Sequence, residues 1–389
     1  MAKVTTRVSW ETYRKEFPIF ERKTYFNTCS LGALSTRVRA ATQAYVDLWD
    51  SYGAAAWYGP WFEELGSLRS DFAKLIGADS EEVALFPSVT AALTAVASCF
   101  DYQSRPKVVL SDLEFPTTVY QWSVKASDGV VLDMVRSAED HLSVPVEAYG
   151  RAIDARTQLV VASHVYFTSG AIQDVGTISR LAHEKGALCL VDAYQSIGQL
   201  PLDVHAAEVD FLVTGGLKWL LGGSGIAYLY VRREWLDRLR PRNVGWFAHR
   251  NQFAFDVRRF EYADDARRFE GGTPSVAATY AGRAGLGIVL EIGVPSLRAR
   301  QQELVGAVVA AARASGLSPR IHGRVEDQAG IVTILRENPA AVVAALARRD
   351  IVVDMRPGVV RLSPYFYNTV GECEQVVGAL IELERAGIR

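Results

Sequence analysis

The middle of the chain alternates short apolar runs with segments whose apolar residues recur at helical spacing. The run at 188–191 (Leu-Cys-Leu-Val) is apolar at successive positions, which is typical of a strand buried on both faces of a mostly parallel sheet. Strands that alternate with helices in this way fold as an α/β domain with helices on both faces of the sheet. We expect strands at residues 83–86, 107–110, 130–135, 159–163, 187–191, 211–214 and 226–231, and helices at 117–126 and 175–185.

The pattern changes after about residue 255. A polar stretch at 256–270 leads through Gly-Gly-Thr-Pro into long helical patterns at 276–292 and 297–314, and shorter helices follow. A chain of 389 residues is long enough for two domains. We therefore predict a large α/β domain at residues 29–258, with a mostly parallel sheet of the seven-stranded type. A smaller α+β domain is expected from residues 1–28 and 259–389.

Charge and cysteine usage exclude several classes of protein. Lys and Arg total 42 against 44 Asp and Glu, a net charge of −2 with no block of like charges, so we expect neither a nucleic-acid nor a membrane partner. The four cysteines are far apart and the six histidines lack metal-ligand spacing, so neither a disulfide framework nor a metal site is predicted. Without an apolar segment of membrane-spanning length, the expectation is a soluble, cytoplasmic protein.

An acid and a lysine follow neighbouring predicted strands, where open α/β sheets gather their functional groups. Asp192 comes directly after one strand, and Lys218 lies four residues beyond the end of the next. Asp192 could simply cap a helix, and Lys218 could be a solvated surface charge. However, Lys218 is embedded in the apolar run Leu-Lys-Trp-Leu-Leu, where burial favours the neutral amine that serves as a Schiff-base nucleophile.

A Schiff-base lysine beside a strand-end aspartate suggests pyridoxal 5'-phosphate, because that cofactor needs a carboxylate to keep its ring nitrogen protonated. The segment 87–92 opens a helix after the first predicted strand, and free N–H groups at a helix start bind phosphate. Phe115 follows another strand end and could stack on the cofactor ring. Taken singly, Ser88 or Thr90 is more often a cap, and Phe115 is more often a core residue.

These residues carry a resemblance to a known family. The chain resembles the class V aminotransferase group of fold-type I pyridoxal-phosphate enzymes, among them kynureninases most closely, with cysteine desulfurases and isopenicillin N epimerases as further relatives. The resemblance runs almost from end to end of the chain. Its motifs are Phe-Asn-Thr at 26–28, the helix opening at 87–92, Phe-Pro at 115–116, Val-Asp at 191–192 with Gln-Ser at 195–196, Lys218, Gly-Trp-Phe-Ala-His at 245–249, Gly-Thr-Pro at 272–274 and the stretch 352–368.

The resemblance implies a role for each matching residue. Lys218 would form the Schiff base and later move protons, and Asp192 would pair with the ring nitrogen. Arg361 would hold the substrate carboxylate, a task that suits the guanidinium fork. Thr273 would come from a partner subunit, which implies a homodimer. The other expected cofactor contacts are Ser88, Val89, Thr90, Phe115, Gln195 and Trp246, and Asn27 and Ser163 are expected to contact the substrate.

Departures from the family pattern narrow the expected chemistry. Cysteine desulfurases of this class carry a nucleophilic cysteine shortly before the carboxylate-binding arginine, and residues 354–361 contain none, so persulfide formation is not expected. Kynureninases have Tyr, His and Asn where this chain has Leu217, Gln195 and Thr273. We therefore predict a kynureninase-like or C–S-type lyase that acts on an amino acid and cleaves at Cβ. The alternatives are a class V aminotransferase or epimerase and, from another class, a non-catalytic binding protein of the same fold.

Two further features have open interpretations. Cys29 lies in the N-terminal segment that the family places near the active site, where it could touch the substrate or be a plain buried thiol. The aromatic cluster Trp57, Tyr58 and Trp61 could line a substrate entrance or pack a helix.

Overall fold

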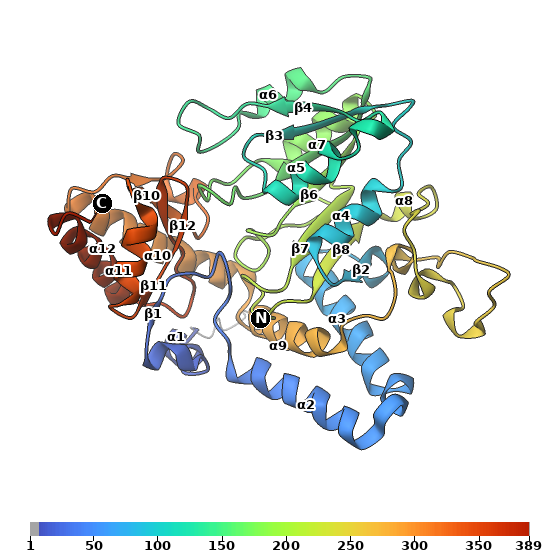
Figure 1. Cartoon of the computed structure of the whole chain (residues 1–389), viewed down its shortest axis with the longest axis horizontal. Coiled ribbons are helices and arrows are strands. Elements are labelled where there is room, and N and C mark those ends of the chain that lie inside the picture. Colours follow the sequence, from blue (N-terminus) through green and yellow to red (C-terminus); the bar gives the residue numbers. More distant parts are fainter. Residues whose placement is uncertain (1–7, 389) are drawn as a thin grey trace, which may run out of the picture.

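A seven-stranded sheet forms the centre of the molecule in the computed structural model, which describes residues 8–388 (Figure 1). Its strand order is β2-β8-β7-β6-β5-β3-β4. Strand β8 pairs antiparallel with β2 and β7, and the other neighbouring pairs are parallel. The predicted α/β fold with a mostly parallel sheet is confirmed. The strands are β2 (Val83–Phe86), β3 (Lys107–Ser111), β4 (Val131–Val135), β5 (Thr157–Ser163), β6 (Leu188–Asp192), β7 (Phe211–Gly215) and β8 (Ala227–Val231).

Helices cover both faces of this sheet because successive strand side chains point to opposite faces. In β3, Val109 packs into one core with α3, α6, α7 and α9, whereas Val108 and Leu110 pack into the other with α4 and α5. Burial on both sides explains the continuous apolar runs of the central strands. These helices are α3 (Pro60–Ile76), α4 (Val89–Ala97), α5 (Pro116–Ser123), α6 (Val146–Ala152), α7 (Val175–Glu184) and α9 (Val276–Ile292).

A smaller layer of strands and helices lies to one side, drawn in orange and red in Figure 1. Its antiparallel sheet has the order β12-β13-β10-β9, and a separate core that includes Leu304, Val360 and Leu380 fills the space beneath its helices. The strands are β9 (Pro319–Arg320), β10 (Val332–Leu335), β12 (Asp354–Arg356) and β13 (Val359–Leu362), and the helices are α10 (Val294–Ala314), α11 (Pro339–Ala347) and α12 (Val370–Arg385).

The beginning of the chain pairs with this smaller layer. Strand β1 (Thr24–Tyr25) lies parallel to β11 (Ile351–Val352), and Arg14 of α1 (Trp10–Arg14) forms an ion pair with Glu372 of α12. The predicted division at residue 258 stays a prediction. Helix α9, which that division assigns to the small domain, packs against α3 and against α2 (Thr36–Tyr52) of the larger layer. The remaining α-helix of the described residues is α8 (Arg233–Leu236), which follows strand β8.

Within residues 8–388, no helix combines the length and the apolar character that crossing a membrane requires.

Candidate active site

The acid and the lysine predicted from the strand ends lie at the same edge of the large sheet. Asp192 is the last residue of β6, and β7 ends at Gly215, three positions before Lys218. Asp192 is only 6% exposed; its Oδ1 accepts from the Tyr194 amide at 2.9 Å and its Oδ2 from the Thr118 hydroxyl at 3.3 Å. Burial raises the pKa of Asp192, and the positive charge of Lys218 opposes that rise. A buried carboxylate in this environment is stabilised when a cation lies close to it.

The Lys218 amine is flanked by two aromatic rings. Its Nζ lies 4.1 Å from the centroid of the Tyr194 ring and 5.9 Å from that of Phe115. Burial lowers the pKa of Lys218 to about 8, although Cys29 and Asp192 act in the opposite direction. A larger fraction of this amine is therefore neutral near physiological pH than for an ordinary lysine, and the neutral amine is the nucleophilic form.

A cavity of about 270 Å³ connects Asp192 and the two rings beside Lys218 to the start of helix α4, and Lys218 itself is not among the residues that line it. Ser88 caps that helix, and its hydroxyl accepts from the Ala91 amide at 3.2 Å. The first-turn N–H groups of a helix have no partner within the helix, so this wall suits an anion. The cavity is lined by Pro87, Ser88, Val89, Thr90, Phe115, Thr117, Thr118, Asp192, Tyr194, Leu217, Ser224, Gly225 and Ile226. It thus combines an anion-binding wall with a buried carboxylate.

Arg361 lies in β13 of the smaller sheet and is fully buried. Its Nη1 donates to the Phe167 carbonyl at 2.5 Å, and its Nη2 donates to the Ser30 hydroxyl at 3.1 Å and forms an ion pair with Asp354. Its Nε has no hydrogen-bond partner among the described residues. The arginine expected to bind the substrate is therefore already paired with a carboxylate of its own chain.

The segment 27–32 brings the beginning of the chain to the site. The Gly32 amide donates to the Leu217 carbonyl at 2.8 Å, and a Cβ atom at Gly32 would lie 2.3 Å from the Lys218 carbonyl oxygen. Only glycine permits this approach to the backbone of the lysine. Asn27, one of the two predicted substrate contacts, pairs through its backbone with Ser363.

Gln195 and Ser163 are held by other protein groups. The amide of Gln195 donates to the Cys29 carbonyl at 2.9 Å and accepts from the Trp219 indole at 2.8 Å, so it braces the N-terminal segment against the Lys218 loop. The Ser163 hydroxyl donates to Glu114 at 2.5 Å, on the strand next to Asp192. The predicted contacts of these two residues with cofactor and substrate stay predictions.

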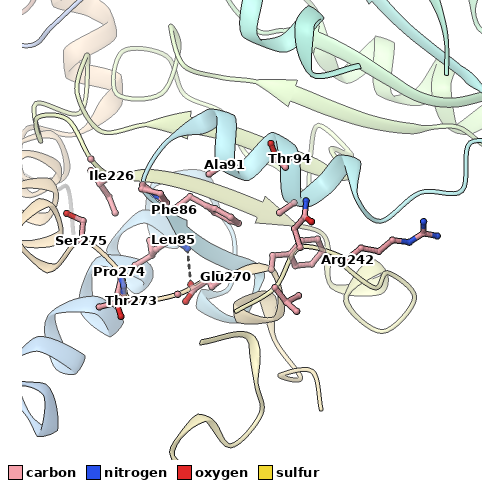
Figure 2. A pocket seen from close by; sticks show the side chains of 18 residues that line it. Leu85, Phe86, Ala91, Thr94, Ile226, Arg242, Glu270, Thr273, Pro274 and Ser275 are labelled. Atoms are coloured by element: carbon pink, nitrogen blue, oxygen red, sulfur yellow. Dashed lines mark hydrogen bonds between the residues drawn. The ribbon is translucent and has the colours of Figure 1, made fainter. Parts of the chain in front are cut away.

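Trp246 and Thr273 do not line the cavity beside Lys218 in the described chain. Thr273 lines a second cavity of about 620 Å³, which adjoins the first because both are bordered by Pro87, Gly225 and Ile226. Figure 2 shows this second cavity between helix α4 and the segment that carries Thr273 and Glu270. Trp246 is 38% exposed and stacks on Phe255 with the ring centroids 5.9 Å apart.

Three residues of the site were missed by the reasoning from sequence. Glu114 is buried against Ser111 and Ser163, and burial raises its pKa to about 7. Tyr194 lies against Lys218, and Asp354 pairs with Arg361. Signals existed for all three, because Glu114 directly precedes Phe115, Tyr194 lies between Asp192 and Gln195, and Asp354 belongs to the motif that contains Arg361.

A mostly parallel sheet with a buried acid and an amine at adjacent strand ends, and a smaller domain beside it, defines the fold-type I class of pyridoxal-phosphate enzymes. The chain belongs to the aminotransferase class-V family, which matches residues 62–376. Family membership confirms the predicted family, and pyridoxal 5'-phosphate is the cofactor of this family.

Relatives of known sequence cover nearly the whole chain. An uncharacterized aminotransferase of Bacillus subtilis, YcbU, is 35% identical over 368 residues, which is 94% of this chain and 96% of YcbU. A kynureninase of Shouchella clausii is 29% identical, over 95% of this chain and 90% of its own length. Among solved structures, a cysteine desulfurase of Thermococcus onnurineus superimposes with a TM-score of 0.89, 23% identity and coverage of 99% of this chain and 100% of that chain. This structural likeness shows the shared fold.

Proposed function

We propose that this protein is a pyridoxal-phosphate-dependent lyase that acts on an amino-acid substrate and cleaves a bond at Cβ. One observation carries the dependence on the cofactor: an amine with a lowered pKa and a buried carboxylate share one edge of the sheet, beside a cavity that begins at a helix N-terminus. Each of these groups matches one need of the cofactor, namely covalent attachment, protonation of the ring nitrogen, and phosphate binding.

The residues present fit the cofactor. Lys218 would attach its aldehyde carbon, Asp192 would face its ring nitrogen, and the first turn of α4 at Ser88, Val89 and Thr90 would bind its phosphate. Phe115 lines the same cavity and is 40% exposed there, so it offers an aromatic face. When bound, the cofactor supplies an electron sink that stabilises negative charge at the substrate Cα.

The chain's own residues would carry the remaining tasks. Asp192 would keep the ring nitrogen protonated, because its buried carboxylate is stabilised by a positive charge placed next to it. The Lys218 amine would take or return a proton at the substrate Cα, and its lowered pKa suits a general base near neutral pH. Arg361 orients the substrate through its carboxylate.

The lowered pKa of Lys218 predicts a pH profile. Below a pH of about 8 the amine is protonated and does not attack the aldehyde, and above it the amine is neutral. Protein freed of its cofactor should therefore take up pyridoxal 5'-phosphate about tenfold faster per pH unit on the acid side and level off above that pH. Borohydride trapping from about pH 6 to about pH 11 measures this rate. A rise that continues to the ordinary lysine value of 10.5 would contradict the lowered pKa.

The type of reaction is decided by its products. Kynureninases among the relatives favour cleavage at Cβ, whereas the relative YcbU, named an aminotransferase, favours transamination. The test incubates the purified protein with a panel of amino acids that includes kynurenine and cysteine conjugates, followed by mass spectrometry of cofactor and products. Cofactor retained as the aldehyde with alanine, pyruvate or ammonia released supports the lyase. Cofactor left as the amine with a keto acid released supports the aminotransferase instead.

We further propose that the protein works as a cytoplasmic homodimer and forms no persulfide. Its thiol nearest the site, Cys29, is fully buried, which does not suit a nucleophile that must transfer sulfur.

The surface around residues 246–260 supports the proposed homodimer. Exposed aromatic and apolar side chains gather there, including Phe255 at 70% and Val257 at 98% exposure. The neighbouring Tyr58, at 81%, lies 6.3 Å from the Phe253 ring, whereas Trp61 of the same cluster is buried. Such a surface suits a partner subunit, to whose site Thr273 would contribute.

A further inference from the structure

The ion pair of Arg361 belongs to a group of charges on the hairpin of β12 and β13. Asp354 and Arg361 lie directly opposite each other in register across the two strands. A single oxygen of Asp354, Oδ2, accepts from Arg361 Nη2, from the Ser30 hydroxyl, and from Arg356 Nη1 at 2.9 Å. The other oxygen, Oδ1, accepts from the Met355 amide at 2.7 Å. Two arginines therefore share one carboxylate oxygen.

On one edge of the Arg361 guanidinium, only one of the two nitrogen atoms has hydrogen-bond partners. Carboxylates bind arginine best through two parallel N–H donors. On the edge formed by Nε and Nη2, Nε has no partner among the described residues, and Nη2 is shared between Asp354 and Ser30. A substrate carboxylate that pairs with both atoms of this edge has to compete for Nη2 with Asp354, its charged partner, and with the Ser30 hydroxyl.

We propose that Asp354 is a specificity-determining residue that competes with the substrate carboxylate for Arg361. In the substrate-free protein it neutralises this arginine, and when a substrate carboxylate pairs with Arg361, the carboxylate of Asp354 stays with Arg356. The inference rests on the proposed function, in which Arg361 binds the substrate carboxylate.

The charges around the hairpin allow this exchange. Arg356 and Arg361 carry two positive charges and Asp354 one negative charge, so the group has one unpaired positive charge that a monocarboxylate neutralises. Burial opposes the ionisation of Asp354, but the Ser30 hydroxyl and Arg361 hold its pKa below its ordinary value, so it is charged at neutral pH. Because Arg356 Nη1 already bonds Oδ2, the carboxylate of Asp354 does not become an unpaired buried charge when Arg361 turns to the substrate.

The exchange would select substrates by their charge. An amino acid with a free carboxylate displaces Asp354 because it restores a charge-assisted pair on Arg361, whereas an amide or ester offers only a neutral acceptor. The Asp354 carboxylate thus excludes neutral analogues by keeping Arg361 occupied.

The test measures binding of propionate, the simplest carboxylate probe, and of propionamide, its neutral counterpart, by calorimetry and by the shift in melting temperature. Asp354→Asn should bind propionate on the order of tenfold more tightly than the parent protein, with propionamide unchanged. Arg356→Gln should bind propionate more weakly, because Asp354 then depends on Arg361. The double variant, which restores the charge balance, should bind like Asp354→Asn. The matched control is Asp350→Asn, which changes an exposed carboxylate that pairs with Lys23. This variant should bind propionate like the parent.

Other outcomes overturn the proposal. If Asp354→Asn binds propionate no better than the parent, Asp354 only positions Arg361. If the double variant binds as weakly as Arg356→Gln, Arg356 contacts the carboxylate itself. These titrations do not depend on the cofactor, so a protein that lacks a borohydride-trappable cofactor but shows the predicted pattern would refute the proposed enzyme and leave the competition by Asp354 standing.

Discussion

Lys218→Ala is expected to abolish covalent attachment of pyridoxal 5'-phosphate and to lower turnover by at least about a thousandfold. The reason is that Lys218 both attaches the cofactor and provides the base at Cα in the proposed reaction, and no second amine lies between Tyr194 and Phe115 within residues 8–388. Borohydride reduction followed by mass spectrometry of the intact protein measures the first effect, and product formation from the best substrate measures the second.

A second lysine provides the control for this variant. Lys74 is exposed and pairs with Asp71 on the surface of α3, so Lys74→Ala should retain the adduct and the activity. When both proteins are compared without cofactor, the melting temperature of Lys218→Ala should not fall below that of the parent, because the change removes a partly desolvated amine rather than a packed apolar side chain. An adduct of unchanged mass in Lys218→Ala would refute the assignment of the site.

The second large effect is expected at Arg361. Arg361→Lys keeps the positive charge beside Asp354 but loses the planar fork, so KM for a substrate with an α-carboxylate should rise about tenfold or more. Arg361→Ala should raise it by roughly two to three orders of magnitude, because the carboxylate then has no charged partner at that position. Cofactor content, followed by absorbance, should be unchanged in both variants.

The stability of both Arg361 variants must be measured together with their KM, because Arg361 is fully buried. Removing one partner of a buried ion pair costs about 3 kcal/mol or more, whereas Asp354 keeps Arg356 and Ser30 as partners, which limits the loss. Arg313→Ala, an exposed arginine at the end of α10, serves as the control. An unaltered KM in a folded Arg361→Lys protein would mean that the substrate carboxylate binds elsewhere.

Much of the fold could be predicted because each buried strand is an uninterrupted apolar run. The seven expected strands coincide with β2–β8 to within two residues at either end, and the expected helix at 276–292 coincides with α9. Asp192 and Lys218 could be singled out for the same reason, since both follow such runs and the topology of parallel strands brings their ends to one edge.

Pairing between side chains was harder to predict. The apolar pattern of β5 shows where Ser163 lies in the sheet but not that its hydroxyl donates to Glu114. Arg361 was expected to hold a substrate carboxylate, but the sequence did not indicate that Asp354 faces it across the hairpin. That partnership could have been found, because Gly358, with φ of 77°, marks a turn midway between the two residues. The placement of Trp246 and Thr273 outside the cavity that Asp192 lines depends on long irregular segments, for which residue patterns carry little information.

The contacts of the N-terminal segment also determine when the site can be completed during synthesis of the protein. Cys29, whose carbonyl is braced by Gln195, donates its amide to Ser363, which is 334 residues further along the chain. Strand β1 likewise can pair only after β11 has been synthesised. The ribosome therefore has to synthesise the chain as far as Ser363 before the N-terminal segment of the active site can meet its partners. Until then, the loop of Lys218 must remain without this support.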